Sequence, residues 1–150
     1  MMVTLPTSYY KGDMYLTPAA TSGSNHGHIG IYGDTNWVVE ASGPDYLSDW
    51  YWHYQISVAQ GSKLLETTFS QAVQNRAADY AYNYLRGYPY NAFFWDNKKN
   101  PSVHGLNCSQ LVWLAYRIPT GADLDGNAGP GVYPYDIEGS PYTRVNWIVQ

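Results

Sequence analysis

Cysteine, charge and long apolar runs are all scarce in this chain, and each shortage excludes a class of protein. The single cysteine, Cys108, excludes an intramolecular disulfide. Charged residues make up 13% of the sequence, with a net charge of −4 and no basic run, so nucleic acid is not an expected partner. No apolar run approaches the roughly 18 residues of a membrane span, so we expect no integral membrane association. The first residues also lack the basic and apolar regions of a signal peptide.

Aromatic residues, by contrast, are abundant, with 16 Tyr, 6 Trp and 3 Phe. Tyr and Trp favour surfaces and clefts in which one end of the side chain is apolar and the other is wet. Together with the low lysine content, this composition favours an extracellular or cell-envelope setting. At 150 residues the chain is long enough to bury a core, and we predict one domain spanning residues 1–150.

The spacing of apolar residues and turn residues predicts an α+β fold. A long helix is expected over residues 69–85, with a capping box from Thr68 to Gln71 at its start and Gly87 after its end. Strands are expected at residues 12–17, 28–32, 37–41, 55–59 and 143–149. The second and third of these strands should form a hairpin, which would place residue 29 opposite residues 39–40.

Cys108 stands where a second helix is expected to begin. Asn107 is a suitable N-cap, and Gln110 completes a capping box. Apolar residues follow at helical spacing to Ile118, and Pro119 ends the pattern. The free backbone N–H groups and the positive end of the helix dipole favour a thiolate, which is the nucleophilic form of cysteine. A lone cysteine is more often an inert buried residue, so a catalytic role also requires a base.

Two histidines compete as that base. His28 begins a predicted strand between Gly27 and Gly30, whose small size leaves room for the imidazole at an open end of the sheet. Glu40, on the next strand of the hairpin, is placed to hold the ring and fix its tautomer as the third group of a triad. His26 falls on the same face by side-chain alternation, so the residues alone leave both histidines open. If neither residue is catalytic, Glu40 is a solvated residue at the end of a strand. His28 then donates only to a backbone carbonyl.

The other histidines and acidic residues give weaker signals. His53 lies in an aromatic run, where packing is expected, and His104 lies in the loop before Cys108, where it could line the site. His26 and His28 could offer two zinc ligands, but no further residues complete a known zinc-binding spacing. Residues 123–134 resemble an EF-hand loop but lack its Gly and Glu. We therefore expect neither a metal nor a cofactor.

Several segments resemble a known family when they are taken in their order along the chain. The motifs are Gly12-Asp13, GHIGIY at 27–32, VVEA at 38–41, YPY at 88–90 and LNCSQLV at 106–112. They are similar to the circularly permuted branch of the NlpC-type papain-like cysteine hydrolases, the YiiX/YycO-like proteins. In the unpermuted family the cysteine helix precedes the histidine strand, whereas here the strand comes first. The resemblance extends over nearly the whole chain.

The resemblance implies a permuted papain-like fold, in which an antiparallel sheet packs against the nucleophile-bearing helix and a second long helix. It assigns Cys108 as nucleophile, His28 as base and Glu40 as the third residue of the triad. The family's tyrosine matches Tyr90 best, although two other tyrosines precede it closely. Its hydroxyl is expected to stabilise the oxyanion together with the Cys108 backbone N–H. The loop at 91–105 matches no family motif, so substrate choice is left open.

The implied activity is acyl transfer through a thioester, without a cofactor. The resemblance points first to an amidase or endopeptidase acting on amide bonds in peptidoglycan stem peptides. It points second to hydrolysis of amide or ester bonds in lipids and other acyl compounds. A third possibility, from a different class, is a non-catalytic module whose aromatic surface binds cell-wall glycan. An occluded Cys108 with His28 turned away would be the sign of such a module.

Overall fold

The fold is built on a six-stranded sheet, seen in a computed structural model that describes residues 1–18 and 26–150. The strand order is β5-β4-β3-β2-β7-β8, and all neighbouring strands are antiparallel. The strands are β2 (Met14–Thr17), β3 (His28–Asp34), β4 (Trp37–Glu40), β5 (Asp49–Trp52), β7 (Lys63–Thr67) and β8 (Thr143–Ile148). A separate two-stranded sheet pairs β1 (Met2–Thr4) with β6 (Ser57–Ala59).

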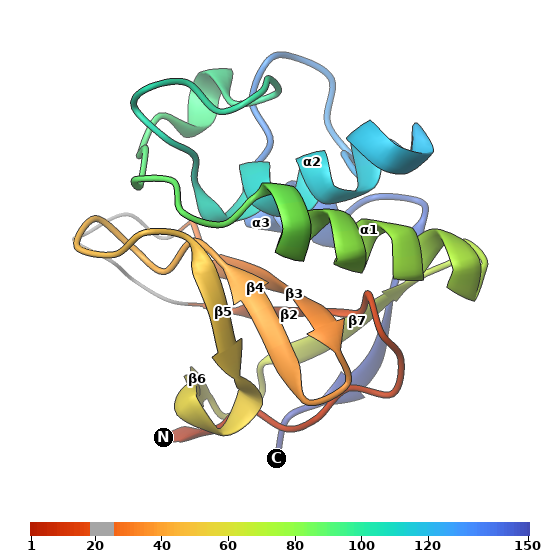
Figure 1. Ribbon diagram of the computed structural model, residues 1–150. Helices are drawn as coiled ribbons and strands as arrows, with labels where there is room; N and C mark the ends of the chain where they lie inside the picture. Colours follow the sequence, from red (N-terminus) through yellow and green to blue (C-terminus); the bar gives the residue numbers. More distant parts are fainter. Residues whose placement is uncertain (19–25) are drawn as a thin grey trace.

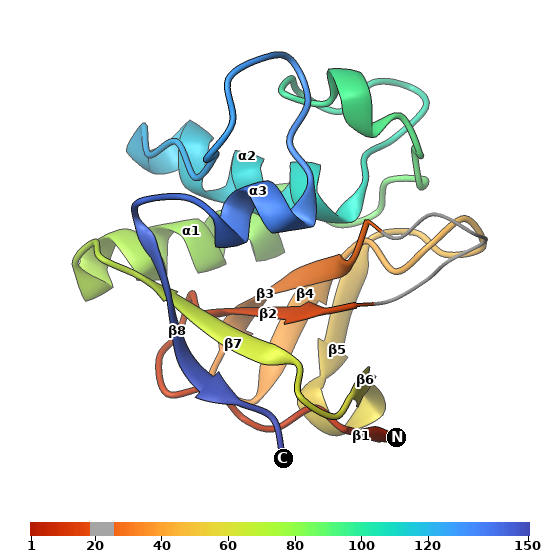
Figure 2. The ribbon, with the colours of Figure 1, turned by 180° about the vertical axis from the view of Figure 1, so that it is seen from behind.

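Three helices lie on one face of the large sheet (Figures 1 and 2). They are α1 (Gln71–Tyr84), α2 (Cys108–Thr120) and the short α3 (Pro134–Glu138). The predicted α+β class with an antiparallel sheet is therefore confirmed, and α1 and α2 are the two predicted helices. Within the described residues, no helix is long and apolar enough to cross a membrane.

The sheet has a separate apolar core on each face, because successive strand side chains point to opposite sides. The larger core lies between the sheet and the helices, and the smaller lies under the β1–β6 pair. Met14 and Leu16 of β2 join the larger core, whereas Tyr15 between them joins the smaller cluster. The orientation of Tyr15 becomes important at the site described below.

The helix ends predicted from capping residues agree only in part with the structure. Asn107 caps α2 as predicted: its side chain accepts a hydrogen bond from the Gln110 backbone N–H at 3.1 Å, and its own N–H donates to Gln110 Oε1 at 3.2 Å. The predicted start of α1 was wrong, because Ser70 rather than Thr68 is the N-cap. The helix α2 also continues through Pro119 and ends at Gly121, which has the left-handed φ of 78°.

The predicted hairpin is present, but its register differs. The strand β3 continues to Asp34, so the turn is shorter than expected and Val39 pairs with Ile31. This brings Glu40 beside Gly30 rather than Ile29. The strands β1, β5 and β7 were not predicted, and the segment expected at 55–59 forms only β6 of the small sheet.

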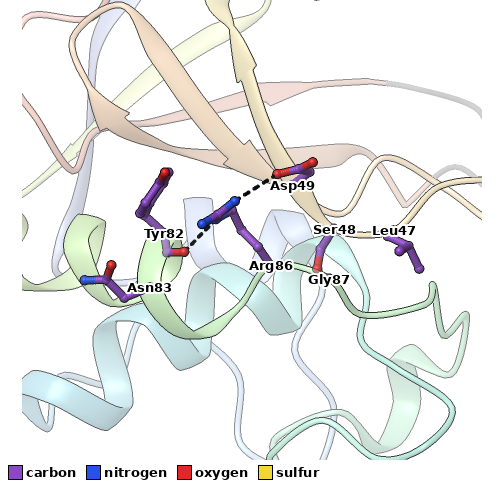
Figure 3. A pocket seen from close by; sticks show the side chains of 7 residues that line it. All are labelled: Leu47, Ser48, Asp49, Tyr82, Asn83, Arg86 and Gly87. Carbon is purple, nitrogen blue, oxygen red and sulfur yellow. Dashed lines mark hydrogen bonds and ion pairs between the residues drawn. The ribbon is translucent and has the colours of Figure 1, made fainter.

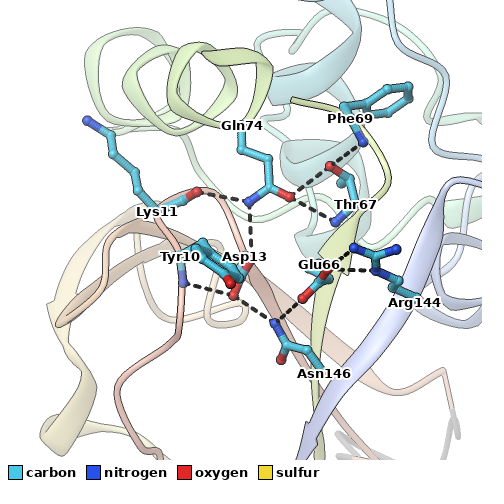
Figure 4. Close-up of polar contacts among 9 residues, drawn as sticks. All are labelled: Tyr10, Lys11, Asp13, Glu66, Thr67, Phe69, Gln74, Arg144 and Asn146. Carbon is cyan, nitrogen blue, oxygen red and sulfur yellow. Dashed lines mark hydrogen bonds and ion pairs between the residues drawn. The ribbon is translucent and has the colours of Figure 1, made fainter. Parts of the chain in front are cut away.

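A buried polar cluster joins the start of β2 to α1 and β8 (Figure 4). Asp13 is fully buried there, and its carboxylate accepts hydrogen bonds from Gln74 at 3.1 Å, Asn146 at 3.0 Å and the Tyr10 backbone N–H at 3.1 Å. Burial raises the pKa of Asp13 to about 6, although these hydrogen bonds oppose the increase. A side chain on Gly12 would come within 2.5 Å of the Gln74 carbonyl, so the close approach of β2 and α1 requires glycine.

Candidate active site

The nucleophile expected from the sequence lies at the junction of the helical layer and the sheet. Cys108 is the first residue of α2 and is buried, with 1% of its surface exposed. His28 is the first residue of β3, and its side chain is 17% exposed. The two side chains lie close enough to interact although they are 80 residues apart in sequence. The sheet and α2 therefore bring the predicted nucleophile and base together.

Glu40 lies on the other side of the imidazole. His28 Nε2 is 2.9 Å from Glu40 Oε2, which leaves Nδ1 as the ring nitrogen available to Cys108. The same carboxylate accepts a hydrogen bond from the Tyr15 hydroxyl at Oε2 and a longer one, of 3.5 Å, from Ser42 at Oε1. With only 5% of its surface exposed, Glu40 depends on these donors to remain charged.

The electrostatics of the site favour a protonated His28 imidazole beside the Glu40 carboxylate. Burial alone would lower the pKa of His28, but hydrogen bonds and charge interactions with Cys108 and Glu40 raise it to about 10. Burial would likewise raise the pKa of Glu40, yet the hydrogen bonds from His28 and Tyr15 hold it below its ordinary range. Chemically, this arrangement suits an imidazole that takes the thiol proton, pairs as a cation with the thiolate and later donates the proton to the leaving group.

Tyr15 is a member of the site that sequence reasoning missed. Its ring centroid is 5.7 Å from that of His28, and burial together with the charge of Glu40 raises the pKa of its hydroxyl well above the ordinary range. The hydroxyl is therefore a donor to Glu40. A side chain on Gly30 would come within 2.5 Å of Tyr15 Cε1. Gly30 thus makes room for Tyr15, whereas the sequence interpretation had assigned that room to the imidazole.

Tyr90 also lies beside the nucleophile. Its segment pairs with the chain just before α2, through hydrogen bonds from Leu106 N–H to the Pro89 carbonyl at 3.0 Å and from Asn91 N–H to the Leu106 carbonyl at 2.9 Å. Burial, and secondarily the charge of Cys108, raise the pKa of Tyr90, so its hydroxyl is a protonated donor. The structure therefore holds Tyr90 against the segment that precedes α2, close enough to Cys108 for the two side chains to interact.

The other three histidines have different surroundings. His26 packs against Phe94 and Tyr133, with ring centroids 4.8 Å and 5.4 Å away. His53 Nδ1 contacts the Leu5 carbonyl at 2.7 Å next to the small sheet. His104 is exposed. Of the two competing histidines, His28 is the one beside Cys108.

A buried network of polar side chains fixes the loops that frame the start of α2. Asn97, which lies in the unmatched loop, donates to Asn107 Oδ1 at 3.0 Å and to the Val132 carbonyl at 2.8 Å. Its own side-chain carbonyl accepts from Val132 N–H at 2.7 Å, and Ser109 donates to the Val132 carbonyl at 2.8 Å. Because Asn97 and Asn107 are buried and paired, the loop before α2 and the loop before α3 are held against the nucleophile.

Comparison with known proteins finds a curated relative similar in sequence and a solved structure similar in fold. No model of a known protein family matches the chain. Over 139 residues, or 93% of its length, the chain is 36% identical to the uncharacterised protein YycO of Bacillus subtilis (strain 168). It covers 56% of YycO, so it spans about half the length of this curated relative.

A solved structure gives the match at the level of the fold. The crystal structure of the metalloprotein yiiX from Escherichia coli O157:H7 superposes with a TM-score of 0.67 at 17% identity. The match covers 96% of this chain and 98% of the other. The fold is YiiX-like. At this identity the likeness concerns the fold alone, and neither name states a reaction.

Proposed function

We propose that the protein is a cysteine hydrolase with a permuted papain-like arrangement of its catalytic groups. Cys108 is the nucleophile, His28 the general base and acid, and Glu40 the residue that orients the imidazole. The observation that carries the proposal is the position of His28, which bonds Glu40 through Nε2 at 2.9 Å and lies close enough to Cys108 to interact with it. A nucleophile, a base and an orienting group in this order form a catalytic triad.

The reaction follows from these positions. The Cys108 thiolate attacks the substrate carbonyl, forming a carbon–sulfur bond and a tetrahedral oxyanion. The Cys108 backbone N–H at the start of α2 and the Tyr90 hydroxyl are the donors that stabilise this oxyanion. His28 then gives its proton to the leaving amine or alcohol as the carbonyl–heteroatom bond breaks. Water, deprotonated by His28, hydrolyses the resulting thioester and releases the acid and Cys108.

The substrates we favour are amide bonds in peptidoglycan stem peptides, met in an extracellular or cell-envelope setting. The resemblance of the motifs and the aromatic-rich surface support this choice. Acyl amides or esters are the alternative, and the exposure of three apolar side chains in the loop before α2 favours it: Phe93 is 55%, Trp95 60% and Val103 89% exposed. Exposed apolar residues of this kind are able to receive an acyl chain.

The side chains of the described residues do not offer a metal ion a set of ligands, although the similar E. coli structure is that of a metalloprotein. Among residues 1–18 and 26–150, no three His, Cys, Asp or Glu side chains are grouped so that they could hold a metal ion. A protein metal centre needs several such donors at one point. The steps of the proposed reaction therefore run through the side chains named above.

The non-catalytic alternative meets only one of its two expected signs. Cys108 is occluded, with 1% exposure, but His28 faces it rather than turning away. This pairing favours the hydrolase over a module in which the cysteine is merely structural. The burial of Cys108 also means that a test of its reactivity needs a small reagent.

Labelling by methyl methanethiosulfonate at pH 6 tests the proposed pair. Because an ordinary thiol is almost wholly protonated at this pH, rapid labelling of the folded protein requires an activated cysteine. We expect the rate to fall at least about tenfold in His28→Ala, since the cation that stabilises the thiolate is lost. His26→Ala is the matched control, because it removes a histidine two residues away that packs on Phe94 and Tyr133. Equal rates in all three proteins would refute the Cys108–His28 pair.

Turnover is tested with purified peptidoglycan and with acyl amides and esters of different chain length. The wild type should hydrolyse one of these substrate classes, and Cys108→Ser should hydrolyse none. Hydrolysis of peptidoglycan alone supports the first substrate class, and hydrolysis of acyl compounds alone supports the second. Labelling at pH 6 without hydrolysis of either class would contradict the proposed reaction.

A further inference from the structure

A continuous band of aromatic side chains follows the β5 edge of the sheet. The band consists of Tyr82, Trp37, Trp50, Trp52 and Tyr54, and each ring contacts the next. The successive centroid distances are 5.2, 5.9, 5.0 and 6.2 Å, and the last pair is nearly parallel, at 8°. We refer to these five residues as the aromatic band.

The strand register explains why these side chains line up. Trp37 pairs directly with Trp52 across β4 and β5, so both point to the same face, and Trp50 shares that face because it lies two residues away. In Figure 1, β5 is the outermost strand of the large sheet, next to β4. None of the five residues is buried, and Tyr54 is 61% exposed. Trp37, Trp50 and Tyr82 pack against the larger core but stay partly exposed. The band is therefore a half-buried surface that ends at the exposed Tyr54.

A polar cavity lies where the band reaches α1. Figure 3 shows the residues that line it: Leu47, Ser48, Asp49, Tyr82, Asn83, Arg86 and Gly87. Arg86 lies over the Tyr82 ring at 3.9 Å, donates to the Tyr82 carbonyl at 2.7 Å and pairs with Asp49 at 3.3 Å. The two charged groups of the cavity thus neutralise each other, while their remaining donor and acceptor positions, with the Asn83 amide, are available to a ligand.

The cavity is adjacent to the candidate active site. Asp49 of β5 pairs directly with Glu40 of the neighbouring strand β4, so the cavity and the triad residue Glu40 lie on adjacent strands. Ser48 holds the other wall: its carbonyl accepts a hydrogen bond from Gly87 N–H at 2.6 Å, and its hydroxyl accepts one from Tyr88 N–H at 3.0 Å. That segment continues directly to Tyr90. A ligand lying along the band and in the cavity would therefore approach the catalytic groups at one end.

We propose that the aromatic band and this cavity bind an uncharged oligosaccharide chain. Pyranose rings present an apolar C–H face, which packs on Trp and Tyr rings, and hydroxyl groups, which pair with planar polar groups such as Asp49, Arg86 and Asn83. A charged ligand would compete with the balanced Arg86–Asp49 pair, and a purely apolar ligand would cover the remaining donor and acceptor positions of both groups without pairing them. A row of rings also suits a polymer of repeating units better than a single small molecule.

The oligosaccharide site rests on the proposed function in one respect: the bound glycan carries the peptide that is presented to Cys108. Binding itself does not depend on the reaction. It is therefore measured in Cys108→Ser protein, in which substrate is not consumed. The probes are the tetramer of N-acetylglucosamine, studied by titration calorimetry, and purified peptidoglycan, studied by co-sedimentation.

Trp52→Ala should weaken the binding of both probes at least about tenfold, because large aromatic contacts dominate many binding surfaces. Tyr54→Ala should weaken it in the same direction, and this side chain is exposed enough that its loss does not disturb the core. Trp147→Ala is the matched control, since Trp147 is an aromatic residue 42% exposed on β8, at the opposite edge of the sheet. Circular dichroism and the unfolding midpoint establish that each variant is folded.

The two proposals fail in different ways. Unchanged binding in folded Trp52→Ala and Tyr54→Ala, or an equal loss in Trp147→Ala, would overturn the oligosaccharide site. The same conclusion follows if Cys108→Ser protein binds neither probe, even when the wild type is rapidly labelled at pH 6. If binding follows the expected pattern but His28→Ala leaves labelling unchanged, the oligosaccharide site stands and the hydrolase does not.

Discussion

Replacing Glu40 by Gln removes the charge of the proposed triad while preserving most of its shape. In the native site, Glu40 Oε2 accepts from both His28 and Tyr15, whereas Oε1 has only the longer contact with Ser42. A glutamine can place its carbonyl oxygen at the Oε2 position and its amide nitrogen toward Ser42. The imidazole therefore keeps its hydrogen bond and its orientation, and the measured change reports the charge.

The magnitude follows from the pKa of His28, which the site raises from 6.5 to about 10. At about 1.4 kcal/mol per pH unit, this increase represents about 5 kcal/mol of net preference for the imidazolium. Burial opposes the increase, and Cys108 and Glu40 together produce it. If Glu40 supplies about half, Glu40→Gln should lower the pKa of His28 by roughly 2 pH units.

The measurement is an NMR titration of the imidazole Cε1–H signal, assigned by comparison with His28→Gln. In the wild type, His28 should remain protonated through neutral pH and titrate in the alkaline range. In Glu40→Gln, its midpoint should fall by roughly 2 pH units. Identical midpoints near 6.5 in both proteins would refute the proposed charge coupling.

The same coupling has a consequence for stability. Because the pKa of His28 is higher in the folded protein than the ordinary 6.5, the protonated ring stabilises the fold fully below about pH 6.5. That contribution is lost as the pH rises toward about 10. The thermal unfolding midpoint should therefore decrease between pH 6.5 and 10 in the wild type and decrease less in Glu40→Gln. An equal decrease in both proteins would show that another group controls the transition.

Three further substitutions test the framework of the site. Gly30→Ala should displace the Tyr15 ring, because the added carbon would lie 2.5 Å from it. We expect slower labelling at pH 6 and a free energy of unfolding in urea that is lower by about 1–3 kcal/mol. Asn107→Ala should lower the free energy of unfolding by about 1–2 kcal/mol through loss of the α2 cap, and an unchanged urea midpoint would contradict that role. Asp13→Asn should also lower the free energy of unfolding by about 1–3 kcal/mol, because an amide would turn an N–H toward donors such as Gln74. A more stable variant would show that the cost of burying the Asp13 charge is the larger effect.

Structural elements whose contacts join residues close together in the sequence were predictable from the sequence alone. The pairing of Asn107 with Gln110 depends on one helical turn, so the sequence alone placed Cys108 at a helix start. The hairpin joining His28 to Glu40 depends on a short turn, so their proximity was also expected, although the register was not. The register was set by the length of β3, which the turn residues alone did not indicate.

The relations between distant segments depend on the tertiary structure. The contact of Tyr15 with Glu40 requires that β2 pair with β3, and the choice between His26 and His28 requires that α2 pack at the start of β3. The strands β5 and β7 carry little local signal, yet their positions create the aromatic band and bury Asp13 between β2, α1 and β8. Local sequence is enough to specify the nucleophile helix and the histidine hairpin, because their interactions span only a few residues. Strand order, packing and the resulting electrostatics arise only when the whole chain folds, because they depend on which elements become neighbours.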